Sequence, residues 1–194
     1  FKETIPCDLL FADLQKIEKK SWIERNRIIK LLPNFSKIYS VNSPSDLNIP
    51  YQLIHDGKWQ QSQKNSIQDF QDSKIQDFTK NQNCIIIGSA HLSDIQILTE
   101  YLKKHPNHSY KCLIVPHEID VKSIAKIQSI LPNSVLYNEE NNTSSILIIP
   151  KMGVLKYLYR FANIAWIGGG FDKSIHNALE AAAYGLPMIS GSNL

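Results

Sequence analysis

Continuous apolar runs alternate with amphipathic helical patterns along the second half of the chain. The runs are short and rich in β-branched residues, which is typical of strands buried on both faces of a parallel sheet. This alternation predicts an α/β fold: a doubly wound, Rossmann-like parallel sheet with helices on both faces. The predicted strands lie at 84–87, 110–115, 135–137, 146–149 and 164–167, and the predicted helices at 92–104, 121–130 and 153–161.

The start of the chain carries a shorter version of the same pattern. A helix predicted over 21–32 opens on a capping box formed by Ser21 and Glu24, and Pro33 ends it. Residues 43–46 predict a turn or another short helix. The predicted strands of this part lie at 8–12, 37–41 and 51–54.

Between these two parts the composition shifts to Gln, Ser, Asp, Lys and Asn, which indicates a boundary. Within it, the sequence IQDF at 67–70 recurs at 75–78. The spacing of eight residues places each Ile and Phe near one face of a helix. We therefore predict a linker with an amphipathic helix over 59–83.

The last part of the chain, 164–194, combines a buried strand, three successive glycines, a helix and a second strand. Asn177 can cap the start of the helix, with Glu180 as its capping-box partner. A helix start above a sheet favours an anion, and phosphate is the expected ligand. Two alternatives stay open, because similar segments occur in domains that bind nothing there, and because Asn177 and Glu180 could form a cap alone.

Ligands of doubly wound sheets bind beyond the carboxyl ends of the strands. His117 and Glu118 follow such an end, although His117 could be a loop residue with no ligand and Glu118 could face solvent or cap the following helix. His176 could equally be a core histidine with satisfied hydrogen bonds. The predicted strand ends lie at 88–89, 116–118, 150–153 and 168–170.

Composition narrows the class of protein further. The 194 residues, 43% of them hydrophobic, can bury a substantial core, and the net charge of +3 comes from scattered lysines that predict no nucleic-acid partner. No apolar run reaches the roughly 20 residues of a membrane-spanning helix. The six histidines are dispersed and predict no metal site. The cysteines, predicted to be buried free thiols, are Cys7, Cys84 and Cys112.

The first residue is Phe1, with no signal-peptide pattern, and the chain stops within a predicted loop. From these features we expect that both ends are cut from a longer sequence.

Three stretches resemble, in order and spacing, the nucleotide-binding half of bacterial 3-deoxy-D-manno-octulosonic acid (Kdo) transferases. They are VPHEID at 115–120, KMGVLKYLYR at 151–160 and IGGGFDKSIHNALEAAAYGLP at 167–187. The likeness covers 84–194 well and 9–58 more weakly. It implies a GT-B fold in which 1–58 is the C-terminal part of the acceptor-side domain and 84–194 is the donor domain that binds the nucleotide sugar.

The resemblance also implies a set of nucleotide-binding residues. Two loops would line the nucleotide, the helix start would bind phosphate through amides and a hydroxyl through a carboxylate, and Lys58 matches a basic residue between the domains. In order, the remaining residues are Ser89, Pro116, His117, Met152, Gly153, Val154, Gly169, Gly170, Asn177, Ala178, Leu179 and Glu180.

The implied reaction is an inverting transfer of Kdo from CMP-Kdo to a lipid A precursor at the cytoplasmic face of the bacterial inner membrane, with peripheral membrane contact. It uses no metal or cofactor. The family's general base is a glutamate earlier in the acceptor domain, so no catalytic residue is expected here and the chain alone should be inactive. Two alternatives stay open: another GT-B enzyme that uses a UDP-sugar, or a non-catalytic remnant. The remnant is favoured by departures from the family pattern at Ala90, His91 and 172–174.

Overall fold

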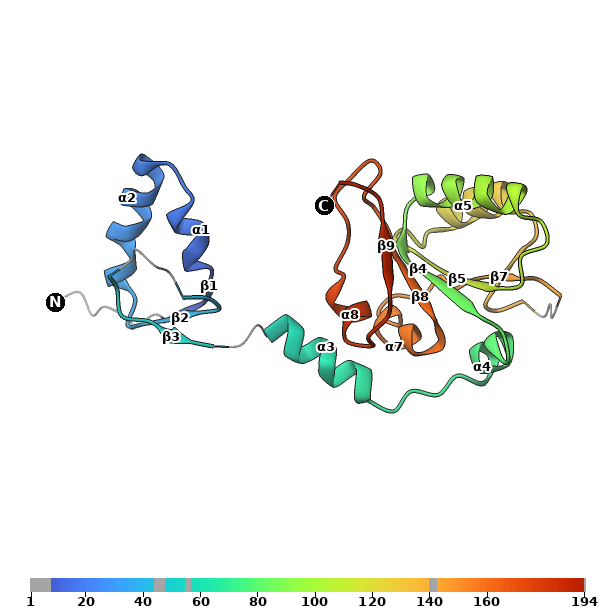
Figure 1. The fold of residues 1–194 in the computed structure, drawn as a ribbon, viewed down its shortest axis with the longest axis horizontal. Coiled ribbons are helices and arrows are strands. Elements are labelled where there is room, and N and C mark those ends of the chain that lie inside the picture. The colour runs from blue at the N-terminus through green and yellow to red at the C-terminus, as the bar shows by residue number, and fades with distance from the viewer. Residues whose placement is uncertain (1–7, 44–47, 55–56, 140–142, 194) are drawn as a thin grey trace. The chain divides into compact units, whose positions relative to one another are not determined.

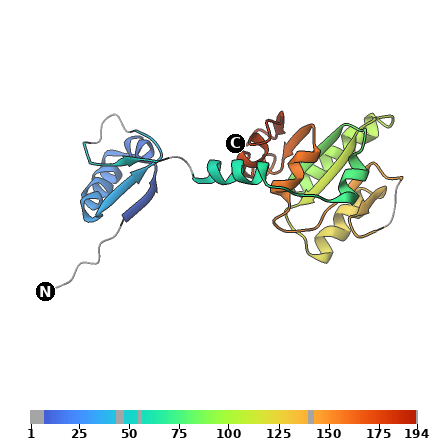
Figure 2. The same cartoon turned by 90° about the horizontal axis from the view of Figure 1, so that it is seen from below.

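The computed structural model describes residues 8–43, 48–54, 57–139 and 143–193 (Figure 1, and from below in Figure 2). The chain divides into two compact units, Phe1–Gln60 and Gln61–Leu194. The division falls within helix α3 (Gly57–Ile67), close to the predicted start of the linker. The predicted assignment of the units as acceptor and donor domains stays a prediction.

The first unit is a small parallel sheet with strand order β1-β2-β3. Its apolar residues pack around a core of Leu14, Leu32 and Ile38. The predicted strands and the helix that Ser21 caps are present, whereas α1 was not predicted, and 44–47 lie outside the described residues. The elements are β1 (Asp8–Ala12), α1 (Leu14–Glu18), α2 (Trp22–Leu31), η1 (Leu32–Asn34), β2 (Lys37–Ser40) and β3 (Gln52–Leu53).

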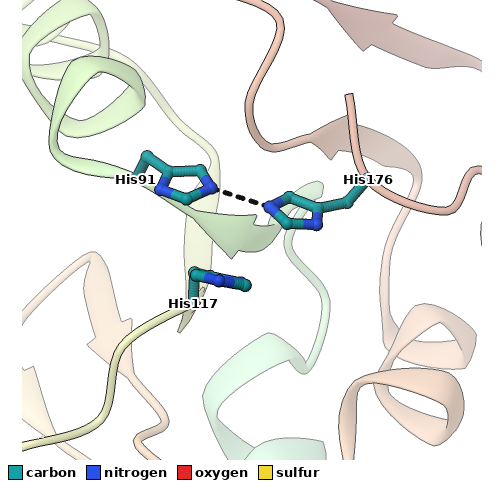
Figure 3. A group of neighbouring side chains, drawn as sticks. All are labelled: His91, His117 and His176. Atoms are coloured by element: carbon teal, nitrogen blue, oxygen red, sulfur yellow. Dashed lines mark hydrogen bonds between the residues drawn. The ribbon is translucent and has the colours of Figure 1, made fainter. Parts of the chain in front are cut away.

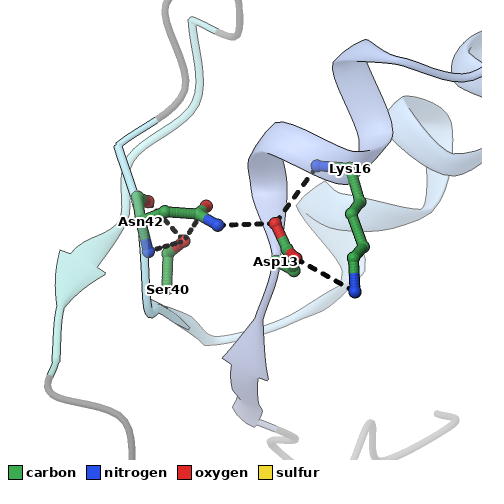
Figure 4. A network of polar contacts seen from close by, with 4 residues as sticks. All are labelled: Asp13, Lys16, Ser40 and Asn42. Atoms are coloured by element: carbon green, nitrogen blue, oxygen red, sulfur yellow. Dashed lines mark hydrogen bonds and ion pairs between the residues drawn. The ribbon is translucent and has the colours of Figure 1, made fainter. Parts of the chain in front are cut away.

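Asp13 links the start of α1 to the end of β2 in this unit (Figure 4). Its Oδ1 accepts from the Lys16 backbone amide at 3.1 Å and from Asn42 Nδ2 at 2.5 Å. The Ser40 hydroxyl in turn donates to the Asn42 carbonyl at 2.6 Å. The hydrogen bond from Asn42 lowers the pKa of Asp13, because it stabilises the charged carboxylate.

The second unit contains six parallel strands in the order β6-β7-β5-β4-β8-β9, which confirms the predicted α/β fold. Helices α5 and α6 were predicted with their observed bounds. Strands β5, β6, β7 and β8 differ from the prediction by at most one residue at either end, whereas β4 continues three residues beyond the predicted end, to Ala90. The elements after α3 are α4 (Ser73–Thr79), β4 (Cys84–Ala90), α5 (Leu92–Lys104), β5 (Lys111–Pro116), α6 (Val121–Ile130), β6 (Ser134–Leu136), β7 (Ile146–Ile148), α7 (Leu155–Leu158), η2 (Tyr159–Phe161), β8 (Ile164–Ile167), α8 (Leu179–Ala182) and β9 (Met188–Ser190).

Both faces of this sheet are buried, because successive side chains of a strand point to opposite faces. In β4, Ile86 belongs to one core cluster, with residues of α4, α7 and α8, and Ile87 to the other, with residues of α5 and α6. Figure 1 shows α5 on one side of the sheet and α7 and α8 on the other. The helices on both faces explain why the strands read as continuous apolar runs.

The single amphipathic helix predicted around the IQDF repeat was wrong. The structure has two helices, α3 and α4, separated by an extended segment in which Phe70 stacks on Tyr157 with ring centroids 4.9 Å apart. Asp72 caps α4 by accepting from the Ile75 amide at 3.1 Å. The isoleucine of the second copy is buried and that of the first copy is not: Ile75 is 1% exposed, whereas Ile67 is 85% exposed.

The predicted burial of the cysteines is confirmed for Cys84 and Cys112, which are free thiols, while Cys7 lies outside the described residues. Burial raises the pKa of each described thiol to about 12, so neither is a thiolate at neutral pH. Among the described residues, none of the helices is long and apolar enough to cross a bilayer.

The backbones of β4 and β8 come unusually close together where both strands end. The amide of Gly168 donates to the carbonyl of Gly88 at 2.8 Å. A Cβ atom at Gly168 would collide with the Ser89 carbonyl oxygen and lie 2.7 Å from that of Gly88. Glycine is therefore required at this position by lack of space.

We predict that Gly168→Ala lowers the free energy of unfolding by about 2–4 kcal/mol, because backbone atoms must move to admit the methyl group. Gly185→Ala is the matched control: its φ is +68° but nothing lies within 4 Å of an added Cβ, so only conformational strain of about 1–2 kcal/mol is expected. Urea unfolding measures both. A cost at Gly168 no larger than that at Gly185 would contradict the close approach.

Candidate functional site

The candidate site lies where the direction of the sheet's connectivity changes. From β4 the chain moves to β5 on one side, and it later returns to place β8 on the other side of β4. Loops after β4 and β8 therefore diverge at their carboxyl ends and leave a crevice of the kind in which such sheets bind ligands. Segments that follow β4, β5 and β8 meet at this switch point.

Asp94 holds the switch point together from the first turn of α5. Its carboxylate is fully buried, and Oδ2 accepts from the backbone amides of His91 at 2.8 Å and Gly169 at 3.1 Å. Its Oδ1 accepts from the indole nitrogen of Trp166 at 3.1 Å. One side chain thus joins the start of α5 to β8 and to the glycine loop, and its three donors offset the cost of burying a carboxylate.

Three histidines surround the crevice, one from each neighbouring strand end (Figure 3). His91 follows β4, His117 follows β5, and His176 belongs to the loop after β8. The Nε2 atoms of His91 and His176 are 2.7 Å apart, and the ring of His117 lies 4.6 Å and 4.5 Å from theirs, measured between centroids. The expectation of dispersed histidines was therefore wrong for these three.

Partial burial lowers the pKa of His176, and the neighbouring His117 and His91 lower it further, against the opposing effect of Asp94. At neutral pH the His176 ring is therefore neutral, with one nitrogen protonated and the other able to accept. A single hydrogen can lie between the Nε2 atoms of His91 and His176, so one ring donates and the other accepts. The core-histidine interpretation of His176 does not hold, because the ring is only half-buried.

A hollow of about 140 Å³ lies beside His91 and His117. Its rim is polar: Ser123 Oγ donates to Glu118 Oε2 at 3.1 Å, and Ser93 Oγ donates to Asp172 Oδ1 at 3.1 Å. Glu118 thus contacts the start of α6, as one of the two sequence interpretations expected, while Asp120 is the residue that caps this helix. The hollow is therefore shaped mainly by the loops after β4 and β5.

The structure places the two predicted nucleotide loops at the same edge of the sheet. Pro116 is the buried last residue of β5, and the side chain of His117 is exposed. In the second loop, after β7, Met152 is 75% exposed and Gly153 has a φ of +74°. Val154 is half-buried against the core. The nucleotide-binding role of these residues stays a prediction.

The second loop reaches the end of β4 through the residues that follow it. A Cβ on Gly88 would lie 3.0 Å from the side chain of Leu155 and 2.6 Å from the hydroxyl of Tyr159. These contacts place the start of α7 against the end of β4, the central strand of the switch point.

The helix predicted to begin at Asn177 is shorter than expected. Helix α8 covers only Leu179–Ala182, and Asn177 Oδ1 accepts from the Leu179 amide at 3.0 Å. The predicted capping box was wrong, since no hydrogen bond returns from Glu180 to Asn177 among those of the described residues. Ala178 and Leu179 are half-buried, and Ala178 packs on the core. Because the glycine loop reaches back to the sheet before the helix can start, residues 170–178 stay irregular.

Glu180 is half-buried beside Tyr159 and Lys156. Burial raises the pKa of Glu180, although the positive charge of Lys156 acts in the opposite direction. No side-chain hydrogen bond of Glu180 is present among the described contacts, so this carboxylate can accept from a ligand.

The remaining predicted residues fall into two groups. Ser89, with a φ of +51°, lies at the irregular end of β4, and Gly169 and Gly170, with φ of +85° and +70°, form the tight backbone turn after β8. The buried Gly169 offers its amide to Asp94 and not to the crevice. Lys58 is exposed at the start of α3, in the first unit, so its role at the nucleotide stays a prediction.

Sequence reasoning missed Asp94 and the grouping of His91 with the other two histidines. Asp94 could have been found as an acidic residue three positions after His91, at the start of the α5 pattern, where a carboxylate can reach back to the residue before the helix. His91 could have been found because it follows a predicted strand end directly. The contact of the three rings depends on strand order, which the sequence pattern alone does not define.

No protein-family model matches the chain. Among curated proteins it is similar to the 3-deoxy-D-manno-octulosonic acid transferase of Chlamydia trachomatis, with 33% identity over 131 residues that cover 63% of the chain and 30% of the relative. It is also similar to the enzyme of the same name from Rickettsia felis, with 26% identity over 207 aligned positions that cover 97% of the chain and 44% of the relative. The chain thus spans less than half the length of these relatives.

Among solved structures, the chain is similar to the C-terminal CMP-Kdo binding domain of WaaA from Acinetobacter baumannii. The TM-score is 0.53 at 16% identity, and the match covers 70% of each chain. At this identity the likeness supports the fold, an α/β domain with a parallel sheet.

We predict that Asp94→Ala lowers the free energy of unfolding by about 2–4 kcal/mol, because three buried donors lose their acceptor. Asp120→Ala is the matched control at the start of α6: Asp120 is an exposed cap, and its loss should cost clearly less than that of Asp94. Urea unfolding compares them. Equal costs would mean that Asp94 acts only as a helix cap.

We predict that Glu180→Gln stabilises the protein at neutral pH by up to about 1 kcal/mol, a limit set by the partial exposure of the side chain. The folded pKa of Glu180 lies above its ordinary value of 4.5, so the folded state binds the proton more tightly than the unfolded chain. Stability is then highest below the ordinary pKa and falls as pH rises through the raised one. Urea midpoints measured from pH 4 upward should show an advantage of the variant that grows as the pH rises above 4.5 and then becomes constant once Glu180 is ionised. A difference that does not change from pH 4 upward would contradict the raised pKa.

Proposed function

We propose that the chain belongs to the 3-deoxy-D-manno-octulosonic acid transferase family and forms the nucleotide-sugar-binding half of a glycosyltransferase whose donor is CMP-Kdo. The relatives carry the name of this transferase, and the similar solved domain is described as binding CMP-Kdo. The transfer itself belongs to the whole protein, of which the chain spans a part.

The convergence of loops at the switch point carries this proposal. The segments after β4, β5 and β8 meet at the carboxyl ends of adjacent parallel strands, and the start of α7 lies against the same edge. A nucleotide needs hydrogen-bond acceptors for its ribose hydroxyls and positively polarised donors for its phosphate. Glu180 supplies a carboxylate whose side chain makes no hydrogen bond among those of the described residues, and His117 supplies an exposed ring.

The predicted residues take distinct roles in the proposal. The loop of Met152, Gly153 and Val154 offers main-chain groups to the nucleotide, and Glu180 binds a ribose hydroxyl. The four-residue length of α8 makes its dipole a small contribution to phosphate binding. Phosphate binding therefore depends more on side chains and loop amides than the sequence pattern indicated.

For the whole protein we propose that Kdo passes to a lipid A precursor by an inverting displacement at its anomeric carbon, with CMP as leaving group. Fixed donors at the switch point would stabilise the charge that grows on the phosphate. The general base that accepts the acceptor proton is expected in the part of the acceptor domain that precedes this chain. The same proposal places the protein at the cytoplasmic face of the inner membrane, in peripheral contact with it.

Isothermal titration of the chain with CMP and with UDP tests the donor class. Binding of CMP that is at least about tenfold tighter than that of UDP, a difference of about 1.4 kcal/mol, supports the proposal. A preference for UDP would instead favour another GT-B enzyme, and binding of neither nucleotide would favour a non-catalytic remnant.

We predict that Glu180→Gln weakens CMP binding by about 1–3 kcal/mol, because a charge-assisted hydrogen bond to the ribose is replaced by a neutral one. Glu100→Gln on the exposed face of α5 removes the same charge away from the crevice and should leave the affinity unchanged. Unchanged CMP affinity of Glu180→Gln in titration calorimetry would show that Glu180 has no contact with the nucleotide.

A further inference from the structure

The three histidines at the switch point lie close enough together to become ligands of one ion. One ring nitrogen of each lies within 4.8 Å of those of the other two. Three nitrogens bound to a tetrahedral Zn²⁺, at about 2.0–2.1 Å from the metal, lie about 3.4 Å from one another. The 2.7 Å between the Nε2 atoms of His91 and His176 must therefore widen, and His117 must move inward. The rings of His91 and His176, whose planes are 13° apart, must also turn so that their nitrogens point at the ion.

The backbone holds all three residues at fixed points of the sheet edge. The His91 amide donates to Asp94 Oδ2 at 2.8 Å, and the His117 amide donates to the Ala90 carbonyl at 3.0 Å. The His176 amide donates to the carbonyl of Gly168 at 3.1 Å. The ligands thus come from three adjacent strand ends that cannot separate without breaking the sheet, which keeps the entropy cost of assembling a site low.

The donor set fits one class of ion. Imidazole nitrogens suit Zn²⁺ and its neighbours among the divalent transition metals, whereas Mg²⁺ and Ca²⁺ prefer oxygen ligands. The nearest buried carboxylate, Asp94, already accepts from three donors. His117 is exposed and the other two rings are half-buried, so an ion can enter from solvent and keep a fourth position for water.

We propose that His91, His117 and His176 form a binding site for a divalent transition-metal ion such as Zn²⁺. The inference rests on these side chains alone and does not depend on the proposed transferase function. The ion would lie beside the predicted nucleotide loops, with its open coordination position available to water or to an oxygen of a bound ligand.

Calorimetric titration of the EDTA-treated chain with ZnCl2 tests the site. We expect one ion per chain, and at least tenfold weaker binding in each of His91→Gln, His117→Gln and His176→Gln. His105→Gln is the matched control, because His105 is an exposed histidine just past the other end of α5 and should leave the affinity unchanged. Thermal melts in EDTA establish that each variant is folded.

Co²⁺ provides a second readout that needs no variant. Intense visible absorption bands typical of four-coordinate Co²⁺ in the unaltered chain, displaced by Zn²⁺, would support the site. Absence of stoichiometric Zn²⁺ binding, or binding that survives all three substitutions, would overturn it. Binding of inorganic phosphate in place of Zn²⁺ would also overturn it, since the rings would then act as protonated anion ligands.

Discussion

The buried carboxylate of Asp94 is the constraint on which the switch point depends. It accepts from the start of α5, from the indole of Trp166 in β8 and from the amide of Gly169, so one residue fixes a helix, a strand and the glycine loop together. Gly168, which makes the close approach to the end of β4, directly precedes the Gly169 that Asp94 holds. His91 and His176 gain their positions from the same two strand ends.

Much of the second unit could be predicted from the sequence, because its strands are buried on both faces and read as uninterrupted apolar runs. Helices α5 and α6 have strong 3.6-residue periodicity and the expected bounds. The IQDF repeat was misleading, because periodicity alone does not show that residues 68–72 pack as an extended segment on Tyr157 and Arg160. In such segments, contacts with distant parts of the chain determine the local structure, whatever the sequence pattern indicates.

The location of the candidate site could also be predicted, since parallel sheets bind ligands at the carboxyl ends of their strands. Its internal arrangement could not. Helix α8 begins at Leu179, two residues later than the pattern indicated, because the glycine loop first hydrogen-bonds back to Gly168 and to the C-terminal segment. The three histidines are separated by 26 and 59 positions, and only the strand order brings them within 4.8 Å of one another.

The sequence similarity and the crevice at the switch point support the same proposal, a site for a nucleotide. A titration of the ¹⁵N-labelled chain with CMP, followed by NMR, tests this most directly. We expect that shifted amide and imidazole signals cluster at His91, His117, Gly169 and His176 and in the loop of Gly153. Shifts confined to another part of the chain, such as the apolar hollow near Phe35 and Tyr51 in the first unit, would contradict it.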